Sequence, residues 1–276
     1  MTISGTATLP ATVADYQVVR LIGEGNNGRF YLARPPARLG IADEFVALKV
    51  FGERIAENAY ERGVRELRAF AAVRSPYLIR VYDAVLDDRF AYAMEWLPLG
   101  SLAAPARPVG RADALKALEH AARAAHSLHE AGLAHGDISP GNVLLAEDSG
   151  AINGRLSDLG LTRLLTPGAT LTGMAGAGSV EYLDPDLLAG SRPSRRSEVW
   201  ALGATLHRVL AGIGLHGDLP ADQPLLAIRR VLSGTPVVQD GLAAADAALV
   251  RDCLAAGAAR LPTAHEVANR IAALDR

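Results

Sequence analysis

The chain has 276 residues, half of them hydrophobic, and a formal net charge of −2 at pH 7. This length can bury a large core in one domain or two lobes, and 28 Lys plus Arg against 30 Asp plus Glu, with no basic run, argue against nucleic-acid binding. No apolar run reaches the roughly 20 residues that span a membrane, and the start lacks the pattern of a signal peptide. The single cysteine, Cys253, excludes internal disulfides. We therefore expect a soluble protein of the reducing cytoplasm.

Up to about Leu97, apolar residues alternate or cluster in short runs that are typical of strands. The runs are YQVVRLI, RFYLA, EFVALKVF, LIRVYDAVL and FAYAMEWL, which begin at residues 16, 29, 44, 78 and 90. Between the third and the fourth run, Val64, Leu67 and Ala71 form one stripe of a helix. We therefore expect residues 1–97 to form a small lobe with an antiparallel β-sheet and one helix.

Beyond Pro98 the spacing of apolar residues changes to the period of a helix. It predicts a long helix around 115–128, a second around 199–213 and a last one around 267–271. The strand-like pieces NVLL and GRLSDLG lie between the first two helices and are joined by the turn-rich stretch AEDSGAING. Residues 98–276 are therefore expected to form a larger, mainly helical lobe, and the whole chain an α+β fold.

The glycines Gly23, Gly25 and Gly28 of GEGNNG match the pattern GxGxxG, which alone is a weak signal. A dinucleotide-binding site would require a helix after the glycines, but the next residues, RFYLA, have the character of a strand. We therefore interpret the glycines as the bend of a hairpin whose backbone amides can approach phosphates. The alternative is an ordinary flexible turn.

Lysine is scarce in this chain, which has 26 arginines but only two lysines, Lys49 and Lys116. Lys49 lies in the middle of the apolar strand VALKV, where a lysine ordinarily extends its ammonium group to solvent. The scarcity favours a specific role, because a compact ammonium group suits the phosphates of a nucleotide. Glu66 on the following helix could hold Lys49 by an ion pair, and a solvated carboxylate is the alternative for Glu66.

The stretch HGDISPGNVLL places Asp137 and Asn142 five residues apart on a loop, and Asp158 follows beyond the predicted hairpin in SDLG. Carboxylate and amide oxygens are the ligands that Mg²⁺ prefers, so Asn142 and Asp158 predict a magnesium site. Asp137 then remains available to accept the proton of a hydroxyl group. Each residue alone could be a turn former or a cap, but the combination favours phosphoryl transfer.

In chain order, the motifs GEGNNGRFYLA, VALKV, MEWLPLGSL, HGDISPGN, SDLGL, GSVEYLDPD, SEVWALG and RLPTAHEV resemble those of the eukaryotic-type protein kinases, including their bacterial members. The resemblance spans residues 16 to about 274. It implies the bilobal kinase fold, ATP and Mg²⁺ as cofactors and a protein substrate with a Ser or Thr hydroxyl. Pro140 fits a loop of the Ser/Thr type better than one of the tyrosine type.

The resemblance implies a catalytic set of five residues. Lys49 would contact the α and β phosphates of ATP, and Glu66 would hold Lys49. Asp137 would be the catalytic base, and Asn142 and Asp158 the magnesium ligands.

The resemblance also implies a set of residues that bind ATP. These are Gly23, Gly25 and Gly28 over the phosphates, Phe30, Ala47 and Leu144 around the adenine, Met94 as the gatekeeper, and Glu95 and Leu97, whose backbone would bond to the adenine.

The chain departs from the family pattern in the loop and beyond it. The family usually has Arg after the loop His and Lys two residues after the Asp, where this chain has Gly136 and Ser139. Ser139 removes a positive charge that would lie near the transferred phosphoryl group. Glu198 replaces an Asp on the second predicted helix.

A further group of departures lies near the end of GSVEYLDPD. Asp184 and Asp186 stand where the family usually has Ala and Glu. Leu261 stands where it commonly has Arg, and Arg260 comes one place earlier. Whether Arg260 still meets Asp186 is left open by the resemblance.

Two other functions compete with a Ser/Thr protein kinase. A small-molecule kinase of the aminoglycoside or choline type would share HGD and the missing lysine, but VALKV, EYLDPD and RLPT fit the protein-kinase pattern. A pseudokinase scaffold would explain Gly136 and Ser139. Such a scaffold would not need the intact set of ATP-handling and magnesium-binding residues.

Overall fold

The computed structural model describes residues 10–25, 28–52, 57–87, 89–158, 180–191, 193–220 and 223–274. The chain divides into two compact units, the first made of Met1–Leu67 and Arg80–Trp96 and the second of Arg68–Ile79 and Leu97–Arg276. The first unit is mainly sheet and the second mainly helix, which confirms the predicted α+β class. No helix within the described ranges has the length and apolar character needed to cross a bilayer.

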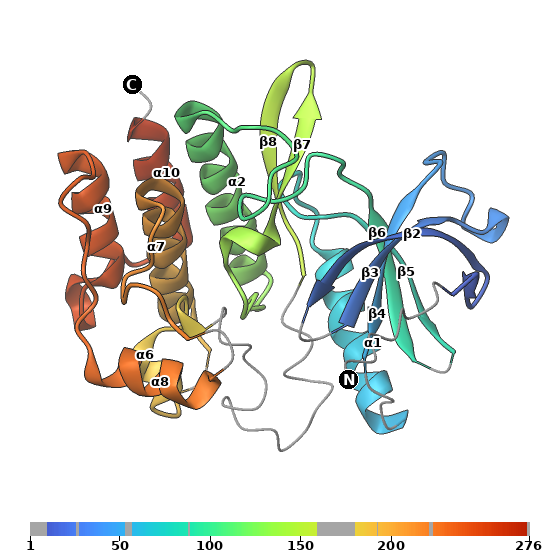
Figure 1. The fold of residues 1–276 in the computed structure, drawn as a ribbon, viewed down its shortest axis with the longest axis horizontal. Coiled ribbons are helices and arrows are strands. Elements are labelled where there is room, and N and C mark those ends of the chain that lie inside the picture. The colour runs from blue at the N-terminus through green and yellow to red at the C-terminus, as the bar shows by residue number, and fades with distance from the viewer. Residues whose placement is uncertain are drawn as a thin grey trace, which may run out of the picture. The chain divides into compact units, whose positions relative to one another are not determined.

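The first unit contains a six-stranded antiparallel sheet in the order β1-β2-β3-β4-β6-β5 (Figure 1). All five predicted strands are present, and only the two-residue strand β1 was too short to leave a pattern. Tyr31, Val46 and Leu48 lie in a buried cluster on this sheet. The strands are β1 (Thr12–Val13), β2 (Tyr16–Gly25), β3 (Gly28–Arg34), β4 (Val46–Phe51), β5 (Val81–Leu86) and β6 (Phe90–Glu95).

The predicted helix of the first unit is α1 (Glu57–Ala72), and its residues beyond Leu67 belong to the second unit. The buried residues Leu67 and Phe70 lie on one face of α1, because positions three apart face the same way on a helix. A short 3₁₀ helix, η1 (Ala37–Leu39), lies between β3 and β4.

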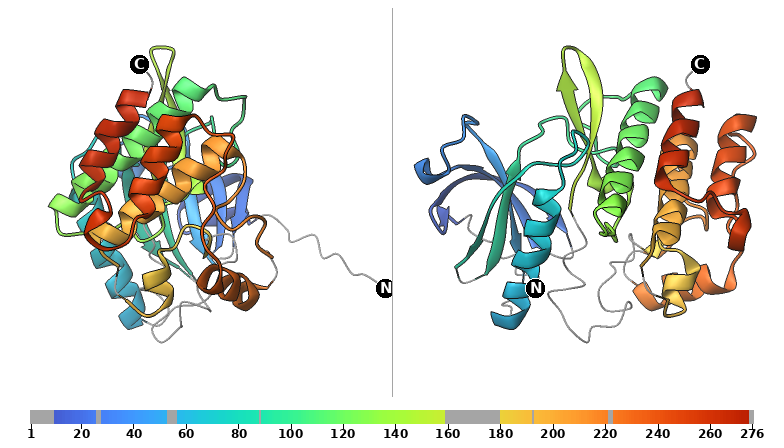
Figure 2. Two further views of the ribbon diagram at one scale, coloured as in Figure 1. Left: turned by 90° about the vertical axis from the view of Figure 1, so that its left-hand side faces the viewer. Right: turned by 180° about the vertical axis from the view of Figure 1, so that it is seen from behind.

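In the second unit the long helix α2 (Arg111–Glu130) contacts α10 (Ala264–Leu274), α7 (Arg195–Ala211) and the hairpin of β7 (Val143–Asp148) and β8 (Ala151–Leu156) (Figure 2). The other described elements of this unit are η2 (Pro140–Asn142), α6 (Pro185–Leu188), α8 (Pro224–Ser233), α9 (Ala244–Leu254) and η3 (Gly257–Ala259).

The three predicted helices of the second unit are confirmed as α2, α7 and α10. Helix α7 begins earlier than its apolar stripe because Ser194 and Ser197 form a reciprocal cap at its start. Helix α8 was not predicted, and for α9 the sequence indicates only the helical spacing of Leu249 and Cys253. In α8, Leu225 is 68% exposed and blurs the apolar face, and in α9 the many alanines give little contrast between the faces.

The β7–β8 hairpin is confirmed, but the predicted turn at 146–154 was too long. Strand pairing continues to Asp148 and Ala151, so that only Ser149 and Gly150 remain in the turn. Both have positive φ, 52° and 83°, which is the geometry of a two-residue hairpin turn. The polar residues that suggested a loop are the solvent-exposed end of two strands.

Candidate functional site

The glycine motif joins two antiparallel strands, since Gly25 at the end of β2 pairs with Gly28 at the start of β3. This confirms the hairpin interpretation, while residues 26–27 of the motif lie outside the described residues. Gly28 has a φ of 140°, and a Cβ atom on it would lie 2.1 Å from the carbonyl oxygen of Val50. Only glycine fits there, so the packing of β3 on β4 alone is sufficient to require Gly28.

Lys49 lies in the centre of β4, where it pairs with Phe30 on β3 and Tyr92 on β6. Its side chain is buried, at 3% exposure, and its Nζ atom lies 5.1 Å from the ring centroids of both Phe30 and Phe51. The ammonium group therefore sits among aromatic rings, and the alternative of a solvent-facing strand lysine is wrong. Glu66 is half-buried on α1, and its ion pair with Lys49 stays a prediction.

The residues predicted to bind adenine fall into both units. Ala47 on β4 and Met94 on β6 are directly paired and buried, and Glu95 is the last residue of β6. Leu97 and Leu144 belong to the second unit. The common adenine pocket of all these residues stays a prediction.

In the second unit the loop residues Asp137 and Asn142 are brought together as the sequence predicts. The Asn142 side chain donates from Nδ2 to the Asp137 carbonyl oxygen at 2.7 Å and to its carboxylate Oδ2 at 3.0 Å. The 3₁₀ turn η2 between them allows this, with Pro140 at its first position. The amide of Asn142 thus fixes the direction of the Asp137 carboxylate.

His135 connects this loop to the end of β8. Its Nδ1 atom accepts a hydrogen bond from the Asp137 N–H at 3.3 Å, so the ring proton is on Nε2, which donates to the Ser157 carbonyl oxygen at 2.9 Å. Ser157 N–H and its hydroxyl both donate to the Asn142 carbonyl oxygen, at 2.8 and 3.1 Å. Asp158 follows directly, so its backbone is fixed relative to Asp137 and Asn142.

Asp158 has a φ of 61°, in the left-handed region that residues other than glycine seldom adopt. Strained backbone of this kind is concentrated at functional sites. Because the NH₂ group of Asn142 faces Asp137, its Oδ1 points elsewhere, and within the described ranges nothing donates to Oδ1. An amide oxygen and a carboxylate on one hydrogen-bonded frame are donors that fit Mg²⁺.

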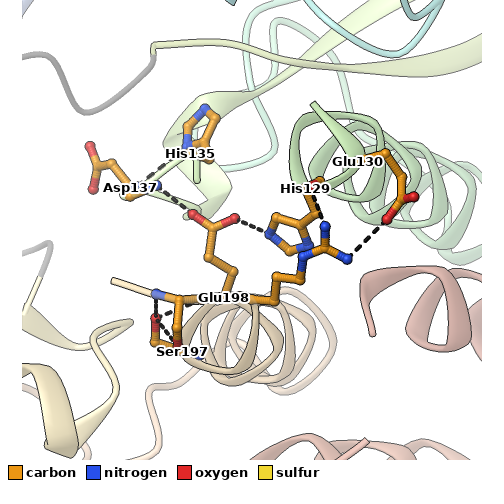
Figure 3. A network of polar contacts seen from close by, with 9 residues as sticks. His129, Glu130, His135, Asp137, Ser197 and Glu198 are labelled. Carbon is orange, nitrogen blue, oxygen red and sulfur yellow. Dashed lines mark hydrogen bonds and ion pairs between the residues drawn. The ribbon is translucent and has the colours of Figure 1, made fainter. Parts of the chain in front are cut away.

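Glu198 on α7 connects the loop to α2 by hydrogen bonds. Its carboxylate accepts from the Gly136 N–H at 2.5 Å and from the His129 Nε2–H at 2.6 Å (Figure 3). Both Glu198 and His129 are buried. Gly136 has a φ of 82°, which glycine adopts without strain. The sequence had marked Gly136 and Glu198 as departures but missed His129. The one indication of its role in the sequence is its position next to Leu128, an apolar residue of the predicted helix.

Arg260 meets Asp184 and not Asp186, which answers the question that the sequence left open. Arg260 Nη1 donates to Asp184 Oδ2 and, at 3.0 Å, to the carbonyl oxygen of Arg196. Its guanidinium also lies 5.3 Å from the centroid of the Trp200 ring. Asp186 is exposed. The acidic partner of Arg260 is therefore Asp184, two residues before the aspartate that the family resemblance had suggested.

A small pocket borders Asp137 within the second unit. Besides Gly136, Asp137 and Ile138, its lining includes Tyr182, Leu183, Leu187 and Ala201. Burial, and to a smaller extent the Glu181 carboxylate, raises the pKa of Tyr182, so its phenol stays protonated at neutral pH. The pocket therefore offers a mostly apolar wall beside a carboxylate.

The chain is similar to known proteins over nearly its whole length. Residues 16–266 match the family described as "Protein kinase domain". Serine/threonine-protein kinase pkn2 of Myxococcus xanthus is 30% identical over 94% of this chain, and the DNA damage-responsive serine/threonine-protein kinase RqkA of Deinococcus radiodurans is 33% identical over 71%. Serine/threonine-protein kinase PknJ of Mycobacterium bovis is 31% identical over 72%. The matched parts are 32%, 30% and 34% of these relatives, so the chain spans about a third of their length.

Proposed function

The chain belongs to the protein kinase family, and from this premise we propose that it transfers the γ-phosphoryl group of ATP to a serine or threonine hydroxyl of a protein. The observation that carries the proposal is the Asn142 amide bound to the carboxylate of Asp137. The serine/threonine preference is supported by the printed names of the bacterial relatives and by Pro140 in the loop. A cytoplasmic location is part of the proposal and rests on the single, buried Cys253.

Asp137 orients the substrate hydroxyl and accepts its proton as the oxygen bonds to the γ-phosphorus and the bond from phosphorus to ADP breaks. Asn142 holds the carboxylate in the direction that this step needs. Asn142 Oδ1 and Asp158 would hold Mg²⁺, which when bound supplies the positive charge that phosphoryl transfer requires. Lys49 supplies an ammonium group to the α and β phosphates.

A scaffold without turnover is the second candidate, and Ser139 is the observation that favours it. A side chain without charge there leaves less positive charge near the transferred phosphoryl group. The test is incubation of the purified chain with labelled ATP and Mg²⁺, with and without a generic protein substrate. Label on protein supports the kinase, whereas nucleotide binding without labelling of any protein or small hydroxyl compound supports the scaffold. Label on a small hydroxyl compound alone would support the small-molecule kinase.

Replacing Asp158 with alanine is expected to abolish transfer and to remove the dependence of ATP binding on Mg²⁺, because the site loses its carboxylate ligand. Calorimetric titration of ATP at increasing Mg²⁺ concentration measures this directly. Asp186→Ala, which removes an exposed carboxylate of the same unit, is the matched control and should keep the Mg²⁺ dependence. An unchanged Mg²⁺ dependence in Asp158→Ala would exclude Asp158 as a ligand.

Lys49→Met is expected to impair transfer severely, and Lys49→Arg should restore it only in part, since a planar guanidinium replaces a compact ammonium group. Lys116→Met is the control, because Lys116 is the other lysine of the chain and its half-exposed side chain pairs with Glu119 on α2. Initial rates with a peptide substrate measure the effect. Full activity in both Lys49 variants would reduce Lys49 to a packing residue of β4.

A further inference from the structure

We propose that Thr205 is a positioning residue for the loop that carries Asp137, an inference that rests on the proposed function of this loop. Thr205 lies in α7 and is 0% exposed. Its hydroxyl Oγ1 donates to the carbonyl oxygen of Ile138, the residue after Asp137, at 3.5 Å. Nothing in the sequence singles out Thr205, because a threonine within an apolar helical stripe resembles a packing residue.

Thr205 and Glu198 lie on the same face of α7. They are seven residues apart, which is two helical turns and a rise of about 10.5 Å. Glu198 accepts from the N–H of Gly136, and Thr205 donates to the C=O of Ile138. The backbone is therefore held by α7 immediately before and immediately after Asp137. These contacts anchor the 135–136 and 138–139 peptide units, one on each side of the two peptide units that flank Asp137, and so restrict the movement of the segment that carries its side chain.

The hydroxyl of Thr205 is what makes this a positioning role. A buried hydroxyl without a partner costs free energy, so an apolar side chain of the same shape would be the better choice if the position only filled space. Val199 and Leu206 of the same helix fill space in this way. The contact to Ile138 is long for a hydrogen bond, and contacts of a catalytic loop commonly shorten when substrate is bound.

The experiment compares two variants that separate the hydroxyl from the methyl group of Thr205. Thr205→Val keeps the shape and removes the hydroxyl, and we expect its kcat to fall about tenfold while KM for ATP stays within about twofold. Thr205→Ser keeps the hydroxyl and removes a buried methyl group, so it should lower the melting temperature and leave kcat close to that of the original protein. A role in packing alone predicts the reverse order, with Thr205→Ser the more damaging change.

A second pair keeps the test decisive if Thr205→Val does not fold. Thr205→Ser and Thr205→Ala differ by the hydroxyl only, and Thr205→Ala should have about one tenth of the kcat of Thr205→Ser. Equal kcat in the members of either pair overturns the inference. Asp137→Asn serves as the reference: if it keeps its activity, the proposed function fails, whereas an inactive Asp137→Asn beside a fully active Thr205→Val refutes the role of Thr205 alone.

Discussion

Replacement of Asp137 by asparagine is expected to lower kcat about 10²- to 10⁴-fold, the range typical for loss of a general base. An amide has nearly the shape of a carboxylate but cannot accept the hydroxyl proton. ATP binding should be nearly unchanged, because Lys49 and the glycine hairpin lie in the other unit and are not altered. Single-turnover rates with saturating ATP and Mg²⁺, combined with a titration of nucleotide affinity, separate the two effects.

Asp148→Asn provides the matched control for this prediction. Asp148 is an exposed carboxylate at the end of β7, and its contact is a hydrogen bond from the neighbouring Ser149 hydroxyl at 3.3 Å. The same chemical change there should leave kcat unaltered. If Asp137→Asn transferred phosphate at the original rate, Asp137 would be a structural residue of the loop and the kinase mechanism proposed for this chain would be wrong.

Removal of one partner of the Asp184–Arg260 ion pair should destabilise the second unit by about 3–5 kcal/mol, because the remaining charge stays buried without its counter-charge. The side chains are only 4% and 6% exposed. Asp184→Ala also removes the cap that accepts from the Asp186 N–H at 3.1 Å, whereas Arg260→Met leaves this cap in place. Arg260→Met is therefore the cleaner of the two variants, and urea denaturation monitored by far-UV circular dichroism measures its effect.

Asp186→Ala tests where the ion pair lies. Its exposed carboxylate should contribute little, so the free energy of unfolding should change by less than about 0.5 kcal/mol. A large loss in Asp186→Ala together with a small one in Asp184→Ala would show that Arg260 pairs with Asp186. In the double variant Asp184→Ala, Arg260→Met the loss should be smaller than the sum of the single losses, because no unpaired charge remains.

The sequence predicted the sheet and the long helices because burial on one face leaves a periodic pattern. Helix α2 has such a face over its whole length, and β4 is apolar at all positions but Lys49. Helix α8 was missed because Leu225, Leu226 and Leu232 lie outside its buried face. A pattern of apolar residues cannot separate those that are buried from those that are exposed.

For the site, the spacing of Asp137 and Asn142 was sufficient to predict that they act together, because the loop of six residues from Asp137 to Asn142 can bring both side chains to one place. Tertiary partners were not predictable in this way. Thr205 touches the loop directly, whereas His129 acts on it through Glu198, and nothing in their own segments marks either residue. Ser157 makes three hydrogen bonds to loop residues, which its place before Asp158 did not indicate. The ion pair of Arg260 was ambiguous because two aspartates two residues apart could each have reached it.

The two lysines of the chain lie in opposite environments, so labelling of lysine amines in this protein is simple to interpret. Lys49 is 3% exposed, while the side chain of Lys116 is 50% exposed. A reagent that acylates amines therefore meets two lysine side chains in this sequence, one accessible and one buried. Digestion with trypsin, which still cleaves after the many arginines, places the two lysines in different peptides. The ratio of the two modified peptides in a mass spectrum reports the accessibility of Lys49 alone, with Lys116 as the internal standard.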